Sequence, residues 1–523
     1  MKKMNLLAMS LVSAAALSFS SCSSNDDLTS GGAGTQSQVK GFYMTLAVQT
    51  PTSNGTRTSI GEKTPTEDAT AVEAAVKNGT FYLVDAKGSV VFSKTLTATD
   101  WAGASGAIKD PTTAAKNGKT TLKIEVENVA AGATYKVYFK AGSTKMDNVN
   151  EPLTIKPGIS LPGIFTADGI AQTFTAPKAF DKTCAVDNDF SMFNQNDVTN
   201  NGNGYTVTFT NQNKEGADGF KPAKVTYGGK VAPIKIERVT ARVDVPTSAS
   251  TLTREALPAD ASAALKKAVK DAQNKVTKIE LVQYALSNVT NKTYVMQNWN
   301  KAESEWSLLI PDDATLSQTK TDFGEKYLFK DGGFKPLTGA THDYIFENNK
   351  PDATAMYFEY KVTLDGTKFE GTADFPEDGT FYRYNNVIYT SFAQILKAYA
   401  DVAGLFDSKS ATDLQKELAE AKKEPTGKTE KSVETKLSEF RAKYGIEVFN
   451  KGLTYYKQVI TDKQLGKDVI QRNTIYRLNV NKIFNVGAQV PNGEIDKNGL
   501  FYLDVTVTVN PWVLNTQDVT LGD

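Results

Sequence analysis

The chain has 523 residues, with 59 Lys and Arg against 59 Asp and Glu, one His and two Cys. At about 100 to 200 residues per domain, this length predicts two to four domains. The formal net charge is zero and no dense run of Lys and Arg occurs, so we expect no nucleic-acid partner. One His without a His/Cys cluster cannot form a His-based metal site. We therefore expect no metal and no cofactor.

The N-terminus has the three parts of a secretory signal. Lys2 and Lys3 precede an apolar run over residues 6–19, and two serines stand just before Cys22. A small-residue cut site followed by Cys is similar to the lipobox of bacterial lipoproteins, in which the thiol is acylated. We predict a lipoprotein signal peptide over residues 1–21 and lipidation at Cys22, with a plain signal peptide as the alternative. The Ser- and Gly-rich run after Cys22 predicts a flexible tether.

Most of the remaining chain alternates apolar and polar residues in short runs between turn residues, which is typical of antiparallel sheets packed face to face. Predicted strands lie in residues 80–92 (a hairpin turning at 85–88), 133–142, 203–211, 356–366 and 473–486. Helical spacing occurs in residues 260–275, 391–406, 410–424 and 433–445. The last two runs are more charged and are expected on the surface.

The strongest candidate domain boundary follows residues 232–245, which read as one long strand that ends at Pro246. Proline removes a backbone donor, so strand pairing tends to stop there. We predict an N-terminal β domain over residues 58–246 and a C-terminal β domain over residues 247–523.

A first strand that could be detached lies at residues 39–50, between two loose stretches. Its apolar face consists of Phe42, Met44, Leu46 and Val48. The stretch that follows contains Arg57 among small residues, an accessible target for a trypsin-like protease. The alternative is that Arg57 is an ordinary loop arginine, because Lys63 in the same stretch would be equally accessible.

A second detachable strand lies in the C-terminal tail, about residues 501–523. Its unbroken apolar face must be covered by something. Residues 486–499 are turn-rich, so we expect that the strand can be held away from its own domain, and we expect Pro511 to interrupt its pairing. Two interpretations remain open: exchange of strands between molecules, or two native strands of one monomer. The apolar residues of the tail are Phe501, Leu503, Val505, Val507, Val509, Trp512, Val513, Val519 and Leu521.

Several segments resemble a known family, the fimbrillins of the Bacteroidales type V pili, and most closely the major structural subunit of the short (minor) fimbriae. The resemblance rests on the lipoprotein signal that ends at Cys22, IKIERVTARVDV (234–245), CAVDNDFSMFN (184–194), KGLTYYKQVI (451–460), VIQRNTIYRLNVNKIFNVG (469–487) and VTVTVNPWVLNTQDV (505–519). It is strongest in the last 75 residues.

This resemblance implies a mainly β fold of two transthyretin-like β-sandwich domains with a few short helices. It implies lipidation at Cys22, a precursor anchored in the outer membrane by its lipid, and cleavage after Arg57 by an Arg-specific trypsin-like protease. Residues 22–57 would then be a propeptide that contains the removable strand. Subunits would form a homopolymer by donor-strand exchange through Phe501 to Leu521, together with accessory anchor and tip subunits. The implied outcome is a cell-surface fimbrium that supports adhesion, biofilm formation and colonisation.

Two other functions remain as alternatives: an accessory tip or anchor subunit, and a glycan-binding surface lipoprotein. The scattered tryptophans are expected as core or interface aromatics, and the acidic pairs 187/189 and 312/313 as turn residues. His342 is expected to be an ordinary strand or loop histidine. No GxSxG, HExxH or P-loop sequence occurs. We therefore expect no catalytic residues and no enzyme activity.

Overall fold

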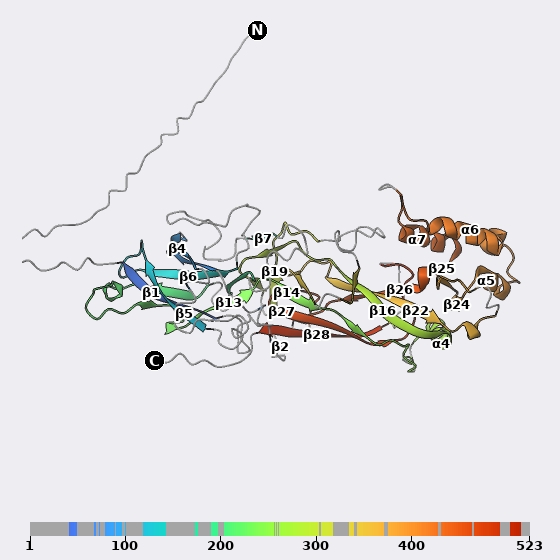
Figure 1. Ribbon diagram of the computed structural model, residues 1–523, viewed down its shortest axis with the longest axis horizontal. Helices are drawn as coiled ribbons and strands as arrows, with labels where there is room; N and C mark the ends of the chain where they lie inside the picture. Colours follow the sequence, from blue (N-terminus) through green and yellow to red (C-terminus); the bar gives the residue numbers. More distant parts are fainter. Residues whose placement is uncertain are drawn as a thin grey trace, which may run out of the picture. The chain divides into compact units, whose positions relative to one another are not determined.

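Strands form most of the regular structure in the computed structural model, and helices are few (Figure 1). This confirms the predicted mainly β class with short helices. No helix within the described ranges is long and apolar enough to cross a membrane. The structure describes residues 41–49, 67–68, 73, 79–88, 90–96, 100, 119–142, 173–175, 190–196, 203–255, 257, 259, 261–302, 305–316, 334–338, 342–370, 375–426, 430–462, 465–491 and 503–513.

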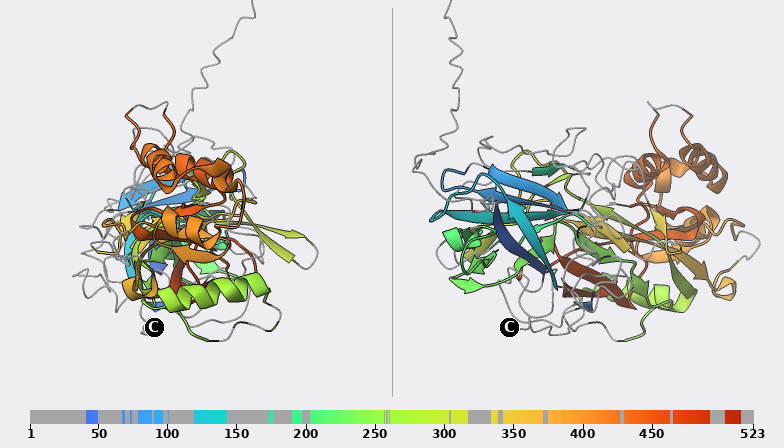
Figure 2. Two further views of the ribbon diagram at one scale, coloured as in Figure 1. Left: turned by 90° about the vertical axis from the view of Figure 1, so that its right-hand side faces the viewer. Right: turned by 60° about the vertical axis from the view of Figure 1, so that its left-hand side comes forward.

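The first sheet is built from strands of the N-terminal half of the chain, and in it β1 lies next to β5 (Figure 2). The predicted hairpin at residues 80–92 is present as β3 and β4, with Gly88 N donating to Asp85 O at 3.1 Å. Gly88 has a φ of 80°, a conformation that favours glycine. The strands of this sheet are β1 (Phe42–Gln49), β3 (Gly79–Val84), β4 (Val90–Leu96), β5 (Lys119–Val126), β6 (Thr134–Ala141), β8 (Met192–Asn194), β9 (Tyr205–Thr208), β10 (Ala223–Lys224), β11 (Thr226–Tyr227), β12 (Lys230–Val231) and β13 (Ile234–Arg238).

Two further sheets contain most strands of the C-terminal half. One has β28 beside β27 and comprises β2 (Glu67–Asp68), β14 (Ala241–Asp244), β15 (Thr247–Ser248), β21 (His342–Ile345), β27 (Thr474–Ile483) and β28 (Leu503–Val513). The other comprises β16 (Val276–Ser287), β20 (Lys335–Pro336), β22 (Ala355–Leu364) and β26 (Leu453–Val459). Smaller sheets pair β7 (Thr173–Thr175) with β17 (Lys292–Tyr294), β18 (Asn298–Ala302) with β19 (Glu305–Leu309), and β23 (Phe381–Tyr384) with β24 (Val387–Tyr389) and β25 (Glu447–Phe449).

The prediction of one long strand over residues 232–245 is wrong. The chain forms β13 in the first sheet and β14 in the second, with Val239 and Thr240 between them. Val239 N donates to Ser191 O at 3.1 Å, and Thr240 O accepts from Asn473 N at 2.8 Å. These two bonds carry the backbone from one sheet to the next. The apolar residues lie at even positions in β13 (Ile234, Ile236) and at odd positions from Val239 onward, so the alternation changes phase where the chain changes sheets.

Buried apolar side chains form two large clusters on either side of this change. The first contains residues such as Met44 and Ile236 and draws mainly on the first sheet. The second runs from Ala241 to Val486 and draws on the two C-terminal sheets. Tyr344 and Ile475 belong to the first cluster although they lie far along the chain. The domain boundary at residue 246 stays a prediction.

The helices begin where serine side chains cap them. Ser262 Oγ accepts from Leu265 N at the start of α4 (Ala263–Lys275), and serines also cap α5 (Phe392–Ala398), α6 (Ala411–Ala421) and α7 (Val433–Tyr444). Helices α6 and α7 lie side by side (Figures 1 and 2) and bury Leu414, Leu418 and Leu437 in a common cluster. Short 3₁₀ turns are η2 (Asn211–Asn213), η3 (Gly366–Lys368), η5 (Leu405–Ser408) and η6 (Asn450–Gly452).

The helix expected over residues 391–406 is too long, because α5 ends at Ala398. Beyond that end, the rings of Tyr399 and Phe406 pack edge-on against Tyr384 of β23, at centroid distances of 5.1 and 5.2 Å. Phe406 has a φ of 52°, outside the helical region. The aromatic contacts thus replace the later helical turns that the spacing suggested.

Candidate strand-exchange site

Strand β1 is paired along both of its edges. Along one edge it forms an antiparallel ladder with β5 over its whole length, from Phe42 opposite Val126 to Gln49 opposite Lys119. Along the other edge it runs parallel to β10 at Met44 and Thr45 and parallel to β13 at Val48 and Gln49. Removal of β1 would therefore open two strand edges at once.

The predicted apolar face of β1 points into the core. Met44 and Leu46 are fully buried, and Val48 is 6% exposed. Phe42 is half-buried, and its ring meets that of Phe209 at 5.6 Å. Burial of a large aliphatic side chain contributes about 2 kcal/mol, so these residues together hold β1 by several kcal/mol. This part of the sequence prediction agrees with the structure, while the removal of the strand stays a prediction.

The opposite face of β1 is also covered, by the segment that follows η2. Tyr43 packs edge-on against Phe220 at 5.9 Å, and Lys123 Nζ lies 4.3 Å from the Tyr43 ring centroid. The Tyr43 hydroxyl donates to Glu215 Oε2 at 3.3 Å. Partial burial, with the neighbouring carboxylates of Glu125 and Glu215, raises the pKa of Tyr43. The first strand is thus held by backbone, core and surface contacts.

Strand β28 is paired quite differently. It forms one antiparallel ladder with β27, from Leu503 opposite Ile483 to Pro511 opposite Thr474. Its other edge pairs with β2 at Trp512 and Val513, and no other strand in the described part of the chain joins that edge. Most of β28 is therefore an edge strand that could leave its sheet by breaking a single ladder.

The register of this ladder matches apolar positions to apolar positions. Val505, Val507 and Val509 lie opposite Val480, Leu478 and Tyr476, which are all buried residues of β27. The pairing with β27 ends at Pro511, and the strand itself continues to Val513.

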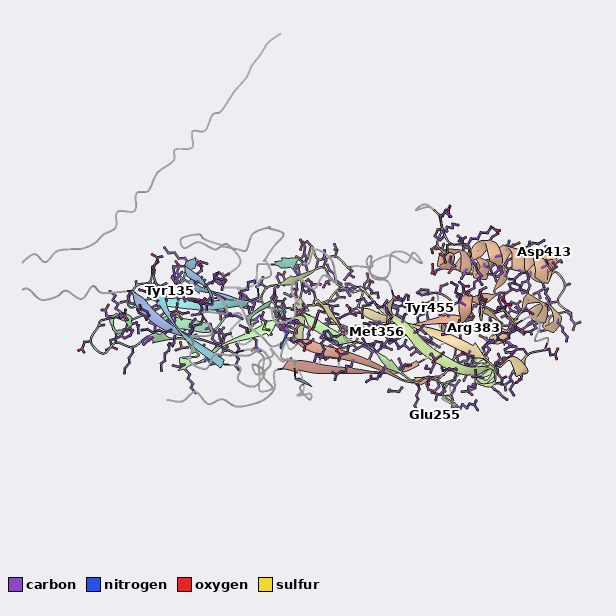
Figure 3. The ribbon with its side chains drawn as sticks, viewed as in Figure 1. Tyr135, Glu255, Met356, Arg383, Asp413 and Tyr455 are labelled. Carbon is purple, nitrogen blue, oxygen red and sulfur yellow. The ribbon has the colours of Figure 1, made fainter. Side chains whose placement is uncertain are left out.

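The linker before β28 is only partly free. Val486 to Val490 are buried, and Tyr455 of β26 exchanges two backbone hydrogen bonds with Ala488, both of 2.9 Å. Arg383 Nη1 donates to Val486 O at 2.8 Å, and Figure 3 labels both Arg383 and Tyr455. The expected free hinge over residues 486–499 is therefore wrong for its first part, because these contacts fix it through residue 490.

The structure also describes predicted residues that do not belong to β1 or β28. Trp299 is 5% exposed, which agrees with its expected core position, and Asp313 lies in a turn and pairs with Lys292. The His342 ring lies 4.7 Å from that of Tyr344. No group of three or more metal-ligating side chains occurs in the parts of the chain that are described. Several residues with a predicted role lie outside the described residues: Cys22, Arg57, Trp101, Asp187, Asp189, Phe501, Val519 and Leu521.

A buried charged cluster around Glu73 was not predicted from the sequence. Glu73 accepts from Arg242 Nη1 at 3.1 Å and from the Tyr344 hydroxyl at 2.9 Å, and its backbone oxygen accepts from Arg238 Nε at 2.9 Å. Burial lowers the pKa of Arg238 to about 10, and the Glu73 carboxylate opposes this shift. The only signal was two arginines, four positions apart, in a run of core-forming residues.

Residues 447–518 match the family model described as major fimbrial subunit protein type IV, fimbrillin, C-terminal. This part of the chain is similar to the C-terminal domain of fimbrillins. The matched part includes β25, β26, β27 and the whole of β28, and so contains the ladder described above. The resemblance to fimbrillins is thereby confirmed for these residues.

Several solved structures match the chain at low sequence identity. A putative cell adhesion protein from Parabacteroides distasonis has 12% identity and a TM-score of 0.42, covering 92% of this chain and 99% of its own. A fimbrilin from Porphyromonas gingivalis has 14% identity and a TM-score of 0.42, covering 91% and 99%. The tip fimbrial protein Mfa3 of P. gingivalis, with a C-terminal truncation, has 12% identity and a TM-score of 0.30, covering 90% and 99%. The fimbrillin assignment rests on the family model, and no curated protein matches the chain.

Proposed function

We propose that this fimbrial subunit is a structural pilin that polymerises by donor-strand exchange, with β28 of one subunit taking the place of β1 in the next. The observation that carries this proposal is the contrast between the two strands: β1 fills a position with partners on both edges, whereas most of β28 depends on one ladder. A strand in the first position must be removed before another can enter. A strand in the second position can be released intact.

The two strands have interchangeable patterns. In β1 the apolar residues recur at every second position from Phe42 to Val48, and in β28 they recur from Leu503 to Val509. Strand β28 has 11 residues and β1 has 8, so the donor is long enough to pair with all of β5. Backbone hydrogen bonds would supply affinity, and the alternating side chains would set the register.

Proteolysis explains how the position of β1 becomes vacant. A strand with both edges paired and three core side chains does not leave spontaneously, because several kcal/mol oppose its release. Cleavage after Arg57 by an Arg-specific protease turns β1 into a separate peptide that a longer donor strand can displace. Lipidation at Cys22 would hold the precursor at the outer membrane until this cut, and the product would be a surface fimbria with accessory anchor and tip subunits that supports adhesion.

The test is N-terminal sequencing of the mature protein from cells, combined with electron microscopy of the same preparation. We expect a mature chain that begins at Thr58 and lies in fibres. Arg57→Ala should leave an uncut precursor without fibres, and the matched variant Lys63→Ala should mature normally. Fibres built from uncut subunits would overturn the exchange proposal. A mature N-terminus elsewhere, still after β1, would reject Arg57 alone.

The lipid is tested separately. Cys22→Ala should abolish labelling of the precursor by a fatty-acid probe. Continued labelling of this variant would place the lipid on another residue.

A further inference from the structure

A cavity of about 520 Å³ lies between the C-terminal end of α4, η3, β24 and α5. No residue of β1 or β28 lines it. Phe369 and Tyr389 supply aromatic rings to its wall. Lys275 Nζ lies 5.3 Å from the Phe369 centroid and 5.5 Å from the Tyr389 centroid. The cavity thus combines aromatic surface with positive charge, within the size range of small-ligand sites.

Lys275 is a fixed part of the wall. Its ammonium donates to Ile388 O at 2.7 Å and pairs with Asp271 at 2.8 Å. Asp271 in turn accepts from Ile388 N at 2.7 Å. The charge of Lys275 is therefore balanced within the protein, and the same bonds tie α4 to β24, the strand that carries Tyr389.

Two more lysines and one glutamate line the cavity, and only one of the two lysines forms an ion pair. Lys397 pairs with Glu370 at 2.6 Å, so these two charges balance each other. Lys368 is exposed. The nearby Asp365 accepts hydrogen bonds from Thr367, which lower the pKa of its carboxyl, and the charge of Lys368 lowers that pKa further. Within the described residues Lys368 forms no ion pair. Its ammonium is the cation that a bound anion can reach.

We propose that this cavity binds an acidic sugar, a carboxylated pyranose at the end of a glycan. The C–H faces of a pyranose pack on aromatic rings, and a carboxylate forms a charge-assisted hydrogen bond with a lysine ammonium. A bare phosphate would use the lysine and leave the two rings without a role. The proposal goes beyond polymerisation and does not depend on it, because the cavity lies apart from β1 and β28.

The test is titration of the purified full chain with 3′-sialyllactose and with lactose by calorimetry at physiological salt. We expect binding of the acidic sugar and at least tenfold weaker binding of lactose. Lys368→Ala should weaken the acidic sugar at least tenfold, whereas Lys416→Ala, at an exposed lysine on α6, should change nothing. Equal affinity for both sugars, no binding of either, or unchanged affinity in Lys368→Ala would overturn the proposal.

A second variant tests whether the sugar binds in this cavity by filling the space, without changing any charge. Ala393 is an exposed residue of α5 that lines the cavity, so Ala393→Trp should fill the space and abolish binding while leaving the fold intact. Binding of 3′-sialyllactose to this variant with the affinity of the unchanged chain would place the sugar elsewhere. Because the titration uses unpolymerised protein, a failure of strand exchange would not affect its result.

Discussion

Arg242 and Glu73 form a buried ion pair in which one guanidinium nitrogen donates to both carboxylate oxygens at 3.1 Å. Arg242 also donates from Nε to Asp244 at 2.7 Å, so the guanidinium bridges two carboxylates. Glu73 follows Arg57 by sixteen positions in the sequence. If the chain is cut after Arg57, this cluster attaches the N-terminal part of the mature chain to buried residues of β14 and β21.

Glu73→Gln should strongly destabilise the protein. The change removes the carboxylate charge that faces the buried Arg238 and one of the two carboxylates that Arg242 bridges. Breaking a buried pair in this way costs about 3–5 kcal/mol. Urea unfolding measures the difference. The control is Glu280→Gln, which breaks an exposed pair with Lys278 and should cost under about 1 kcal/mol. Equal, small effects of the two changes would mean that the buried pair does not anchor residue 73.

Leu46→Ala should affect the precursor and not the mature subunit. Leu46 is fully buried in β1, and truncating such a leucine costs about 2–5 kcal/mol. In fibres, β1 has been replaced, so the same variant should give fibres with unchanged resistance to denaturant once cleavage has occurred. Ala47→Ser, on the other face of the strand, is the matched control for both measurements. Fibres weakened by Leu46→Ala would show that β1 remains in the polymer.

Val507→Asp should prevent fibre formation. Val507 lies at the centre of the apolar pattern of β28, opposite the buried Leu478 in the register with β27. An unpaired carboxylate at such a position is costly to bury in a neighbouring subunit. Thr506→Asp changes the adjacent position, which alternates to the other face of the strand, and should still give fibres. Electron microscopy of the two cleaved variants decides, and normal fibres from Val507→Asp would reject β28 as the donor.

Acid should weaken the fold through Glu447. Burial alone would raise the pKa of this carboxyl, but the Arg383 guanidinium, with Arg441 nearby, holds it below its ordinary value of 4.5. A pKa that is depressed in the folded state contributes stability that is present above pH 4.5 and is lost as the pH falls through the lower folded value.

The unfolding free energy should therefore fall as the pH is lowered from 4.5, and Glu447→Gln should make this dependence less steep. Glu439→Gln, at an exposed pair with Lys431, is the control and should leave the pH profile unchanged. A Glu447→Gln profile as steep as that of the unchanged chain would contradict the assignment of this pH dependence to Glu447.

Period-two alternation predicted the strands well where each strand stays in one sheet. The apolar face of β1 and the hairpin of β3 and β4 are visible from residue pattern alone, because each side chain points to one of two faces. The prediction missed the break between β13 and β14, although the apolar positions change from even (Ile236) to odd (Val239) at this point. A local pattern can mark such a break, but it carries no information about the distant partners Ser191 and Asn473, which hold the backbone at the change of sheet.

The sequence predicted the strands of the candidate site but not their pairing partners. The sequence identified the two strands, but not that one is paired on both edges and the other mostly on one, since pairing depends on β5, β13 and β27 together. Residues 486–490 looked like a free hinge because Gly, Asn and Pro follow them closely. Their burial comes from Arg383 and Tyr455, which are distant in sequence. Glu73 was missed because a single glutamate in a small-residue stretch resembles many surface residues.

The ladder between β1 and β5 also sets how a fibre would bear load. A donor in the place of β1 lies along β5, so tension that pulls two subunits apart along the strand axis acts on the hydrogen bonds in shear. Eight residue pairs then share the force, from the partner of Val126 to the partner of Lys119. They must give way together and cannot open one at a time. A fibre without covalent links between its subunits would in this way resist flow at a surface.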